Sequence, residues 1–155
     1  MRVMWRYKVE KSPPLHGTVG ASISKNSVLP LMAACLLTDE DVVLSHVPRL
    51  QDVWAMGELL EALGVEVAYE GEGVRLRCRQ GRPTAAPLHL TRQLRASFIV
   101  LGPLAARFGE AFVPLPGGCG IGARPVDLHL KGLSQMGAEI TSDHGGIACR
   151  GRLQG

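Results

Sequence analysis

The chain has 155 residues, of which 46% are hydrophobic, 20% are charged and 5% are aromatic, and its formal net charge is +3. That length is sufficient for one domain with a substantial core, and that composition is typical of a soluble globular protein rather than a disordered one. There is no dense run of Lys and Arg and no aromatic platform, so nucleic acid is a weak candidate ligand. Small anions suit the mild positive charge better.

The sequence also shows no targeting signal and no metal-binding motif. The most apolar run, VLPLMAACLL, is too short to cross a membrane, and the basic N-terminal stretch is not followed by the apolar run of a signal peptide. The cysteines are scattered without a CxxC pair, so we expect reduced thiols in a cytoplasmic protein, no metal site and no cofactor. They are Cys35, Cys78, Cys119 and Cys149.

The first half of the chain predicts a leading strand over residues 5–10 and then helix, strand, helix, strand, strand. The first helix spans residues 27–37, with Pro30 in its first turn, and a strand follows over residues 41–45. The second helix starts near Asp52 and ends at Gly64. Its apolar residues recur on one face, and the strands after it flank a turn at residues 70–73.

The second half predicts the same order. A helix spans residues 92–107, a strand spans residues 111–115, and a second helix runs from the region of Val126 to Gly137. Two strands follow, around a turn at residues 143–146.

The two halves are therefore copies of one pattern. DVWAMGELLEALGVEVAYEGEGVRLRC in the first half corresponds to DLHLKGLSQMGAEITSDHGGIACR in the second, at an offset of about 75 residues. Both copies begin with Asp and have Gly five residues later. Units of this kind cover a sheet with helices, so we expect an α/β (α+β) fold with unit one at about residues 25–79 and unit two at about residues 92–151.

The stretch SKNSVLP contains the first candidate site. Lys25 and Asn26 come just before the predicted helix, where free backbone N–H groups and the helix dipole favour an anion. The alternative is a solvated lysine followed by an Asn N-cap. Arg95 is the second candidate, since it enters a strongly apolar helix and must either snorkel to water or meet an anion.

The stretch LPGGCGIGARPVD contains the third candidate. Cys119 lies among glycines rather than in an apolar run, and it is either an inert thiol or one partly activated by the nearby arginine and helix start. Arg124 follows, where its planar guanidinium suits phosphate. Pro125 suits the first position of a helix. Asp127 in the first turn either caps the helix or accepts hydrogen bonds from a ligand, and the sequence does not decide whether His129 contacts a ligand.

These motifs resemble one family. LHGTV, SKNSVLPLMAACLLTDEDVVLSHVPRLQDV, LRASFIVLGPLAARFGE and LPGGCGIGARPVDLHLKGL are similar, in this order, to the N-terminal part of the UDP-N-acetylglucosamine 1-carboxyvinyltransferases, which are enolpyruvyl transferases. The resemblance runs from about Leu15 to Ile140. It implies the inside-out α/β barrel fold of that family, built from repeated β-α-β-α-β-β units, of which two are present here.

The resemblance also implies an activity. The family transfers enolpyruvyl from phosphoenolpyruvate to UDP-N-acetylglucosamine in peptidoglycan precursor synthesis, and it releases phosphate. By position, Cys119 matches the catalytic cysteine, which donates a proton and forms a covalent adduct, and which the epoxide fosfomycin alkylates. The residues matching phosphoenolpyruvate contacts are Lys25, Asn26 and Arg124, and those matching UDP-N-acetylglucosamine contacts are Arg95, Arg124, Pro125, Val126, Asp127 and Leu128.

Some features depart from the family. Ser22-Ile23-Ser24 stands where the family has Ser-Gly-Ala, and Lys11-Ser12 replaces a Gly-Gly pair. The family's chain is also more than twice as long, with its active site between two domains, and its leading strand belongs to the other domain.

Three readings follow. We expect a truncated or split transferase with negligible activity alone, which self-associates or binds a chain that supplies the missing domain. The alternatives are a non-catalytic nucleotide-sugar-binding or regulatory module and an interaction protein that uses only the scaffold.

Overall fold

The computed structural model describes residues 6–21, 23–78, 84–115, 126–143 and 145–154. The first repeat, which we call unit one, spans residues 25–78. It contains helices α1 (Lys25–Ala34) and α2 (Gln51–Ala62), the 3₁₀ turn η1 (Cys35–Leu37) and strands β1 (Val42–Leu44), β2 (Val65–Glu70) and β3 (Gly73–Cys78). Both pairings in its sheet are antiparallel, in the order β1-β3-β2.

The second repeat, unit two, spans residues 84–150 and builds a sheet with the same order of strands. Its helical segments are α3 (Leu88–Gln93), η2 (Arg95–Val100), α4 (Leu101–Phe108) and α5 (Asp127–Gln135), and its strands are β4 (Glu110–Pro114), β5 (Glu139–Asp143) and β6 (Gly146–Arg150). The sheet has the order β4-β6-β5 and is antiparallel throughout. The repeat seen in the sequence is therefore a repeat in topology.

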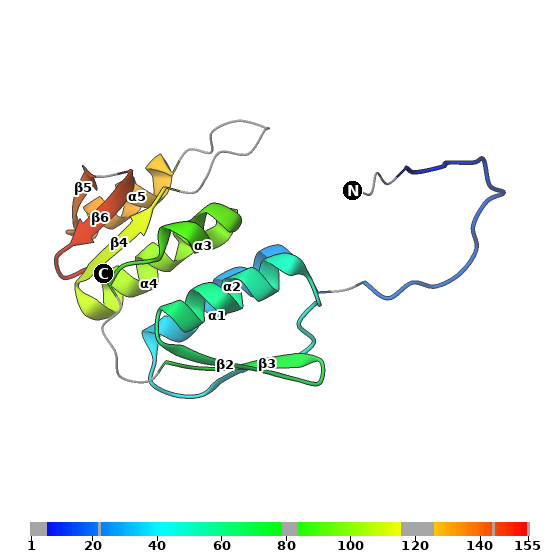
Figure 1. The fold of residues 1–155 in the computed structure, drawn as a ribbon, viewed down its shortest axis with the longest axis horizontal. Helices are drawn as coiled ribbons and strands as arrows, with labels where there is room; N and C mark the ends of the chain where they lie inside the picture. The colour runs from blue at the N-terminus through cyan, green and yellow to red at the C-terminus, as the bar shows by residue number, and fades with distance from the viewer. Residues whose placement is uncertain (1–5, 22, 79–83, 116–125, 144, 155) are drawn as a thin grey trace.

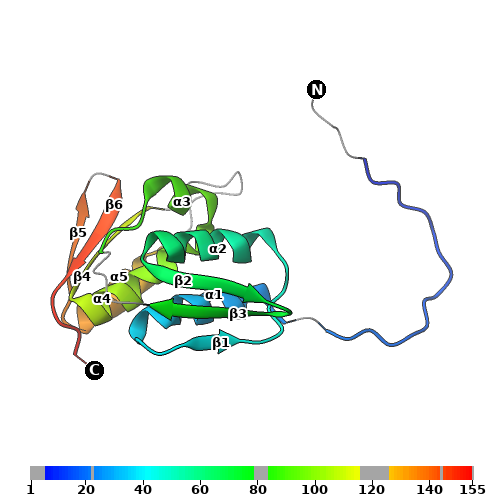
Figure 2. The ribbon, with the colours of Figure 1, turned by 60° about the horizontal axis from the view of Figure 1, so that its bottom comes forward.

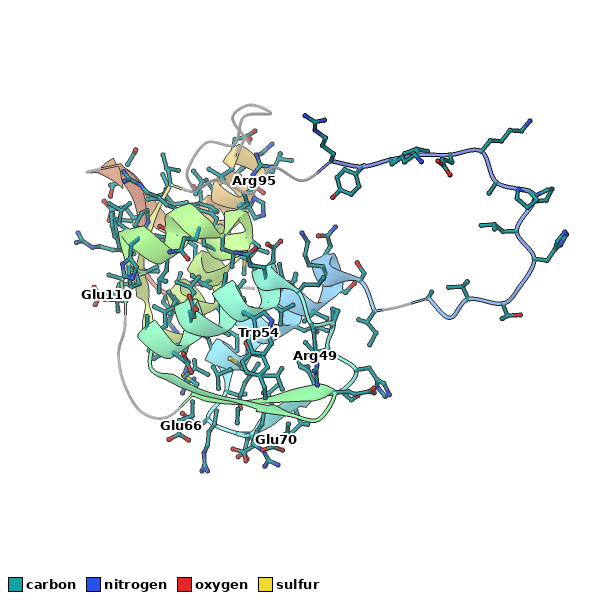
Figure 3. The ribbon with its side chains drawn as sticks, turned by 45° about the vertical axis from the view of Figure 1, so that its right-hand side comes forward. Arg49, Trp54, Glu66, Glu70, Arg95 and Glu110 are labelled. Carbon is teal, nitrogen blue, oxygen red and sulfur yellow. The ribbon has the colours of Figure 1, made fainter. Side chains whose placement is uncertain are left out.

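The two units face one another through their helices. Figures 1 and 2 show α1 and α2 on the inner face of one sheet, α3 and α4 on the inner face of the other, and the sheets on the outside. In Figure 3, Glu66 and Glu70 point outward from the sheet of unit one. The predicted α/β class and helix-in, sheet-out arrangement are confirmed.

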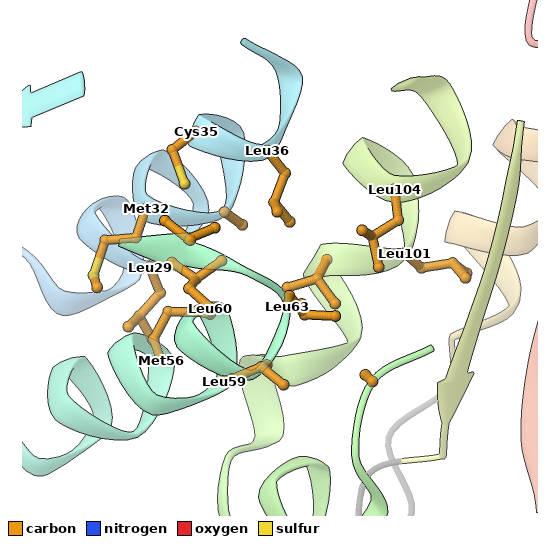
Figure 4. Close-up of a cluster of buried hydrophobic side chains, with 14 of the residues drawn as sticks. Leu29, Met32, Cys35, Leu36, Met56, Leu59, Leu60, Leu63, Leu101 and Leu104 are labelled. Carbon is orange, nitrogen blue, oxygen red and sulfur yellow. The ribbon is translucent and has the colours of Figure 1, made fainter. Parts of the chain in front are cut away.

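Alternation of apolar and polar residues explains the core. Along β3, Val74, Leu76 and Cys78 are buried, while the residues between them face water. Met56, Leu60 and neighbouring side chains of α2 belong to one continuous cluster with side chains of α1, η2 and α4 (Figure 4). Because the core spans both units, neither unit buries its helices by itself.

Three predicted elements differ from the structure. The single helix over residues 92–107 is wrong: Leu94 is extended, with φ −121° and ψ 117°, and the segment is divided into α3, η2 and α4. Pro103 contributes, because it lacks the N–H that would continue an α-helical ladder back through η2. The first helix begins at Lys25 rather than residue 27, and its last turn is the 3₁₀ turn η1.

The leading strand over residues 5–10 is the third difference. Trp5 is outside the described residues, and residues 6–21 are extended without joining either described sheet. The side chains of Tyr7 and Val9 are 97% and 91% exposed. A strand requires a neighbouring strand to pair its backbone groups, and Figure 1 shows this segment projecting away from the rest of the chain.

Candidate functional site

Lys25 is the first residue of α1, and its side chain is about four-tenths exposed. The N-cap is Ser24, so the alternative in which Asn26 caps the helix is wrong, and Asn26 is an exposed residue of the first turn. The first N–H groups of an α-helix have no intrahelical acceptor. A cationic side chain therefore stands where the backbone also favours an anion.

Asp52 lies directly opposite this lysine. The Nζ of Lys25 donates a hydrogen bond of 2.5 Å to the Oδ2 of Asp52, in the first turn of α2. Asp52 was not among the site residues predicted from the sequence. A signal was available, because an Asp opens each copy of the repeat, but spacing alone does not show that Asp52 faces a residue 27 positions away.

Arg95 begins η2 and is half-buried. Within the described part of the chain, its guanidinium makes no hydrogen bond or ion pair with another side chain. Phe98, three residues later, contacts the ring of His129 edge-on, with centroids 6.1 Å apart. This contact brings η2, and with it Arg95, close to the start of α5 (Figure 3).

The start of α5 presents polar and apolar side chains to solvent. Val126 is the N-cap, and the helix begins at Asp127. Val126 is half-buried, while Asp127, Leu128 and His129 are exposed. Asp127 does not occupy the capping position, which is Val126, and the exposure of these residues agrees with a role in ligand contact.

Cys119, Arg124 and Pro125 lie outside the described residues. The other three thiols are buried in the core. Burial raises the pKa of Cys35 to about 12, with a smaller contribution from Cys78, and burial also raises the pKa of Cys149. A buried thiol of this kind remains protonated and is a poor nucleophile.

The candidate residues thus fall into two groups. One is Lys25 with Asn26 and Asp52, and the other is Arg95 with the start of α5. Helix α1 packs against η2, so the helices that bear Lys25 and Arg95 are neighbours. An open depression of about 250 Å³ lies elsewhere, at the edge of the unit-one sheet near His46 and Arg75, and none of the predicted site residues lines it.

The described residues contain no cluster of three or more His, Cys, Asp or Glu side chains that could hold a metal ion. None of their helices has the length and apolar character required to span a bilayer.

Comparison with known proteins gives consistent results. The sequence is 45% identical over 147 residues to UDP-N-acetylglucosamine 1-carboxyvinyltransferase 1 of Caldanaerobacter subterraneus, covering 95% of this chain and 35% of that protein. It is 51% identical over 149 residues to the UDP-N-acetylglucosamine 1-carboxyvinyltransferase of Maricaulis maris, with coverage of 95% and 35%. The chain therefore spans about a third of the length of these relatives.

Solved structures agree on the fold. The enolpyruvyl transferase NikO from Streptomyces tendae superposes with a TM-score of 0.72 at 21% identity, over 90% of this chain and 31% of that one. EPSP synthase from Acinetobacter baumannii gives a TM-score of 0.61 at 16% identity, over 89% and 32%.

The family model described as EPSP synthase (3-phosphoshikimate 1-carboxyvinyltransferase) matches residues 9–152, nearly the whole chain. Its match, the similar sequences and the shared fold lead to one assignment: the chain belongs to the EPSP synthase family of enolpyruvyl transferases.

Proposed function

We propose that the chain forms the N-terminal part of a UDP-N-acetylglucosamine 1-carboxyvinyltransferase, in which enolpyruvyl passes from phosphoenolpyruvate to UDP-N-acetylglucosamine. The observation that supports this most is the 45–51% identity, across nearly the whole chain, to enzymes of that name. The reaction would belong to peptidoglycan precursor synthesis in the cytoplasm.

The described residues suit the anionic parts of both substrates. Lys25 and Asn26 at the start of α1 are the proposed contacts to phosphoenolpyruvate, together with Arg124. Arg95 is half-buried and has no partner among the described side chains, so it is available to an anionic group of the nucleotide-sugar. Val126, Asp127 and Leu128, with Arg124 and Pro125, would complete that second contact.

The proposed chemistry needs a proton donor and cations. The sugar hydroxyl attacks carbon 2 of phosphoenolpyruvate and gives its proton to a base on the rest of the protein, while carbon 3 gains a proton. The C–O bond to phosphate then breaks and carbon 3 loses a proton, which restores the double bond of the transferred enolpyruvyl group. Cys119 is the proposed donor of that proton and the residue that forms the covalent adduct. Lys25 and Arg124 would stabilise the negative charge on the phosphate as it leaves.

We also propose that catalysis requires a further chain segment. The relatives are about three times as long, and the activity would need the remaining segment of such a protein, on the same chain or on a partner chain. One wall of a site can bind a substrate, but it cannot exclude water or orient two reactants.

Calorimetry with UDP-N-acetylglucosamine tests the binding part of this proposal. We expect the chain to bind the nucleotide-sugar more weakly as salt is added, because much of the contact is between charges. Arg95→Ala should lower the affinity roughly tenfold or more, the usual effect of losing a hydrogen bond to a charged group. Arg75→Ala is the matched control, since Arg75 is an exposed arginine in ion pairs with Asp41 and Glu70 on the unit-one sheet.

The same titration can reject the proposal. Absence of binding up to millimolar ligand would remove the claim for this chain. Equal losses in Arg95→Ala and Arg75→Ala would show that only net charge matters. Binding without any phosphate release after the rest of a relative is supplied would favour a non-catalytic binding module.

A further inference from the structure

The ion pair between Lys25 and Asp52 joins the starts of two packed helices. Lys25 is the first residue of α1 and Asp52 the second of α2, and their side chains are separated by 2.5 Å, Nζ to Oδ2. Helices α1 and α2 pack closely along their length. The backbone positions of Lys25 and Asp52 are therefore fixed, because nearby residues of both helices are buried in the core: Val28, Leu29, Val53 and Met56.

We propose that Asp52 is a positioning residue for Lys25. Its carboxylate holds the ammonium at the start of α1, in the place where it contacts the phosphate or carboxylate of phosphoenolpyruvate. This inference rests on the proposed function, because it takes Lys25 to be a ligand of that anion.

The lysine side chain explains why such a partner matters. Lys has a flexible four-carbon stem, and fixing it in one rotamer costs conformational entropy each time a ligand binds. A hydrogen bond to Asp52 restrains the stem before the ligand arrives. The ammonium has three N–H donors, so one bond to Asp52 leaves two for an anion.

The negative charge of Asp52 acts in the opposite direction, because it weakens the attraction of Lys25 for an anion. The side chains of Lys25 and Asp52 are 43% and 42% exposed, so water screens that charge substantially. The geometric restraint is not screened. We therefore infer that restraining the Lys25 side chain raises the affinity for the anion more than the charge of Asp52 lowers it. Substitution of Asp52 measures the direction of this net effect.

Unit two offers an internal contrast. Arg95 and Asp127 occupy the comparable places, at the start of η2 and of α5. Between these two described side chains there is no ion pair. The guanidinium of Arg95 is already planar and loses less freedom for each hydrogen bond it forms, so it has less need of a carboxylate to orient it.

The test uses the full 155-residue chain and four variants: Lys25→Ala, Asp52→Ala, Asp52→Asn and, as a control that removes another ion-paired carboxylate, Glu70→Ala. Side-chain NMR relaxation reports the mobility of Lys25, with the exposed Lys131 as an internal reference. Titration with phosphoenolpyruvate reports affinity. Asparagine retains an acceptor oxygen without the charge, so it separates restraint from electrostatics.

We expect Lys25 to be restrained in the wild type and in Asp52→Asn, and as mobile as Lys131 in Asp52→Ala. Phosphoenolpyruvate affinity should fall roughly three- to tenfold in Asp52→Ala, the loss expected for one hydrogen bond. Affinity should stay near that of the wild type in Asp52→Asn and in Glu70→Ala. A purely structural role for Asp52 would lower the melting temperature without this pattern.

The opposing outcomes are distinct. Equal mobility of Lys25 in the wild type and in Asp52→Ala overturns the inference whatever the ligand does. Tighter binding by Asp52→Ala, with weaker binding by Lys25→Ala, also overturns it but leaves the proposed function intact. Unchanged affinity in Lys25→Ala would instead reject Lys25 as an anion ligand, and with it this inference and the Lys25 contact in the proposed function.

Discussion

Units one and two have the same strand order but bury their second helices very differently. Helix α2 buries Val53, Met56, Gly57, Leu59 and Leu60, whereas the corresponding α5 has no buried residue. Leu128 of α5 is 76% exposed. The same strand order therefore occurs with a buried second helix, α2, in unit one and with a second helix, α5, that has no buried residue in unit two.

The difference follows from position and sequence together. Helix α2 packs against α1 on one side and against α3 and η2 of unit two on the other. When the two opening Asp residues are aligned, Met56, Leu59 and Leu60 correspond to Lys131, Ser134 and Gln135. A repeat can thus keep its backbone pattern while each copy adapts its helix surface to its neighbours.

The loops before these helices differ as well. Six residues connect β1 to α2, and twelve connect β4 to α5. The additional length in unit two contains the Gly-rich sequence around Cys119, which has no counterpart in unit one. Cys119, the candidate nucleophile, therefore lies in a sequence that is present in unit two and has no counterpart in unit one.

Cysteine labelling should reveal the largest contrast. Cys78 ends β3 and Cys149 lies in the matching strand β6, and both are buried, as is Cys35. We expect iodoacetamide or an epoxide to modify Cys119 first. Burial raises the pKa of Cys35 from an ordinary value of 9.0 to about 12, so its thiolate is roughly a thousandfold scarcer than that of an ordinary thiol. Peptide mass mapping after limited reaction measures the order.

Unfolded chain in urea is the control, because all four cysteines should then react alike. Labelling of Cys35 before Cys119 in the folded chain would contradict the interpretation.

The raised pKa of Cys35 also predicts a pH dependence of the free energy of unfolding. The contribution of Cys35 is fully present below about pH 9 and is lost as the pH rises toward about 12, since only the unfolded state readily loses that proton.

Truncation of core leucines tests the helix comparison directly. Leu60→Ala in α2 should lower the free energy of unfolding by about 2–5 kcal/mol, because a fully buried side chain is removed. Leu133→Ala in α5 should cost about 1 kcal/mol or less, since Leu133 is only half-buried. Urea unfolding followed by circular dichroism compares them, and equal losses would show that α5 is packed as firmly as α2.

Arg107 of α4 links the two units through backbone carbonyl groups. Its Nη1 donates to the carbonyl oxygens of Leu36 at 2.8 Å and Thr38 at 2.9 Å, and its Nη2 pairs with Asp39. Arg107→Met should cost about 2–3 kcal/mol in the free energy of unfolding, because these acceptors lose a charged donor.

The lysine variant sharpens this prediction. Arg107→Lys retains the charge but cannot reproduce the planar set of donors, so we expect it to recover only part of the loss. Asp39→Ala is the control for the exposed part of the contact and should have little effect. Full stability in Arg107→Met would show that α4 and η1 are held by apolar packing alone.

The smallest predicted effect concerns association through α5. The exposed Leu128 should add to self-association of the chain or to binding of a partner that covers α5. Leu128→Lys should weaken self-association roughly tenfold, as expected when one apolar contact is lost. Leu88→Lys, at a 48% exposed site on α3, is the matched control. Sedimentation over a range of concentrations measures both, and a monomer at every concentration would contradict the prediction.

Much of the fold could be predicted because its local signals agree. Gly64 and Gly137 were expected to end the second helix of each unit, and both have positive φ, at 81° and 95°. The hairpin turn between β2 and β3 lies at the predicted residues. The sequence does not predict that residues 92–107 are divided into several helical segments, because the apolar pattern continues through Leu94. The chain is extended at Leu94, directly after α3, which packs against α2 and β4.

The candidate site could be predicted only in part. Chemistry and resemblance identified Lys25 and Arg95, because a cation at a helix start is visible in the sequence. Asp52 was missed because its role depends on packing between α1 and α2, which brings together residues 27 positions apart. Likewise, nothing in local sequence indicates that Phe98 joins η2 to His129.

Reconstitution tests the central claim most directly. The chain would be mixed with the part of the Thermotoga maritima relative, 47% identical over the matched region, that lies beyond this region, and phosphate release would be measured with both substrates present. We predict release in the mixture, negligible release by the chain alone, and loss of activity in Cys119→Ala. Absence of release from a complex that sedimentation shows to have formed, or full release by Cys119→Ala, would contradict the account.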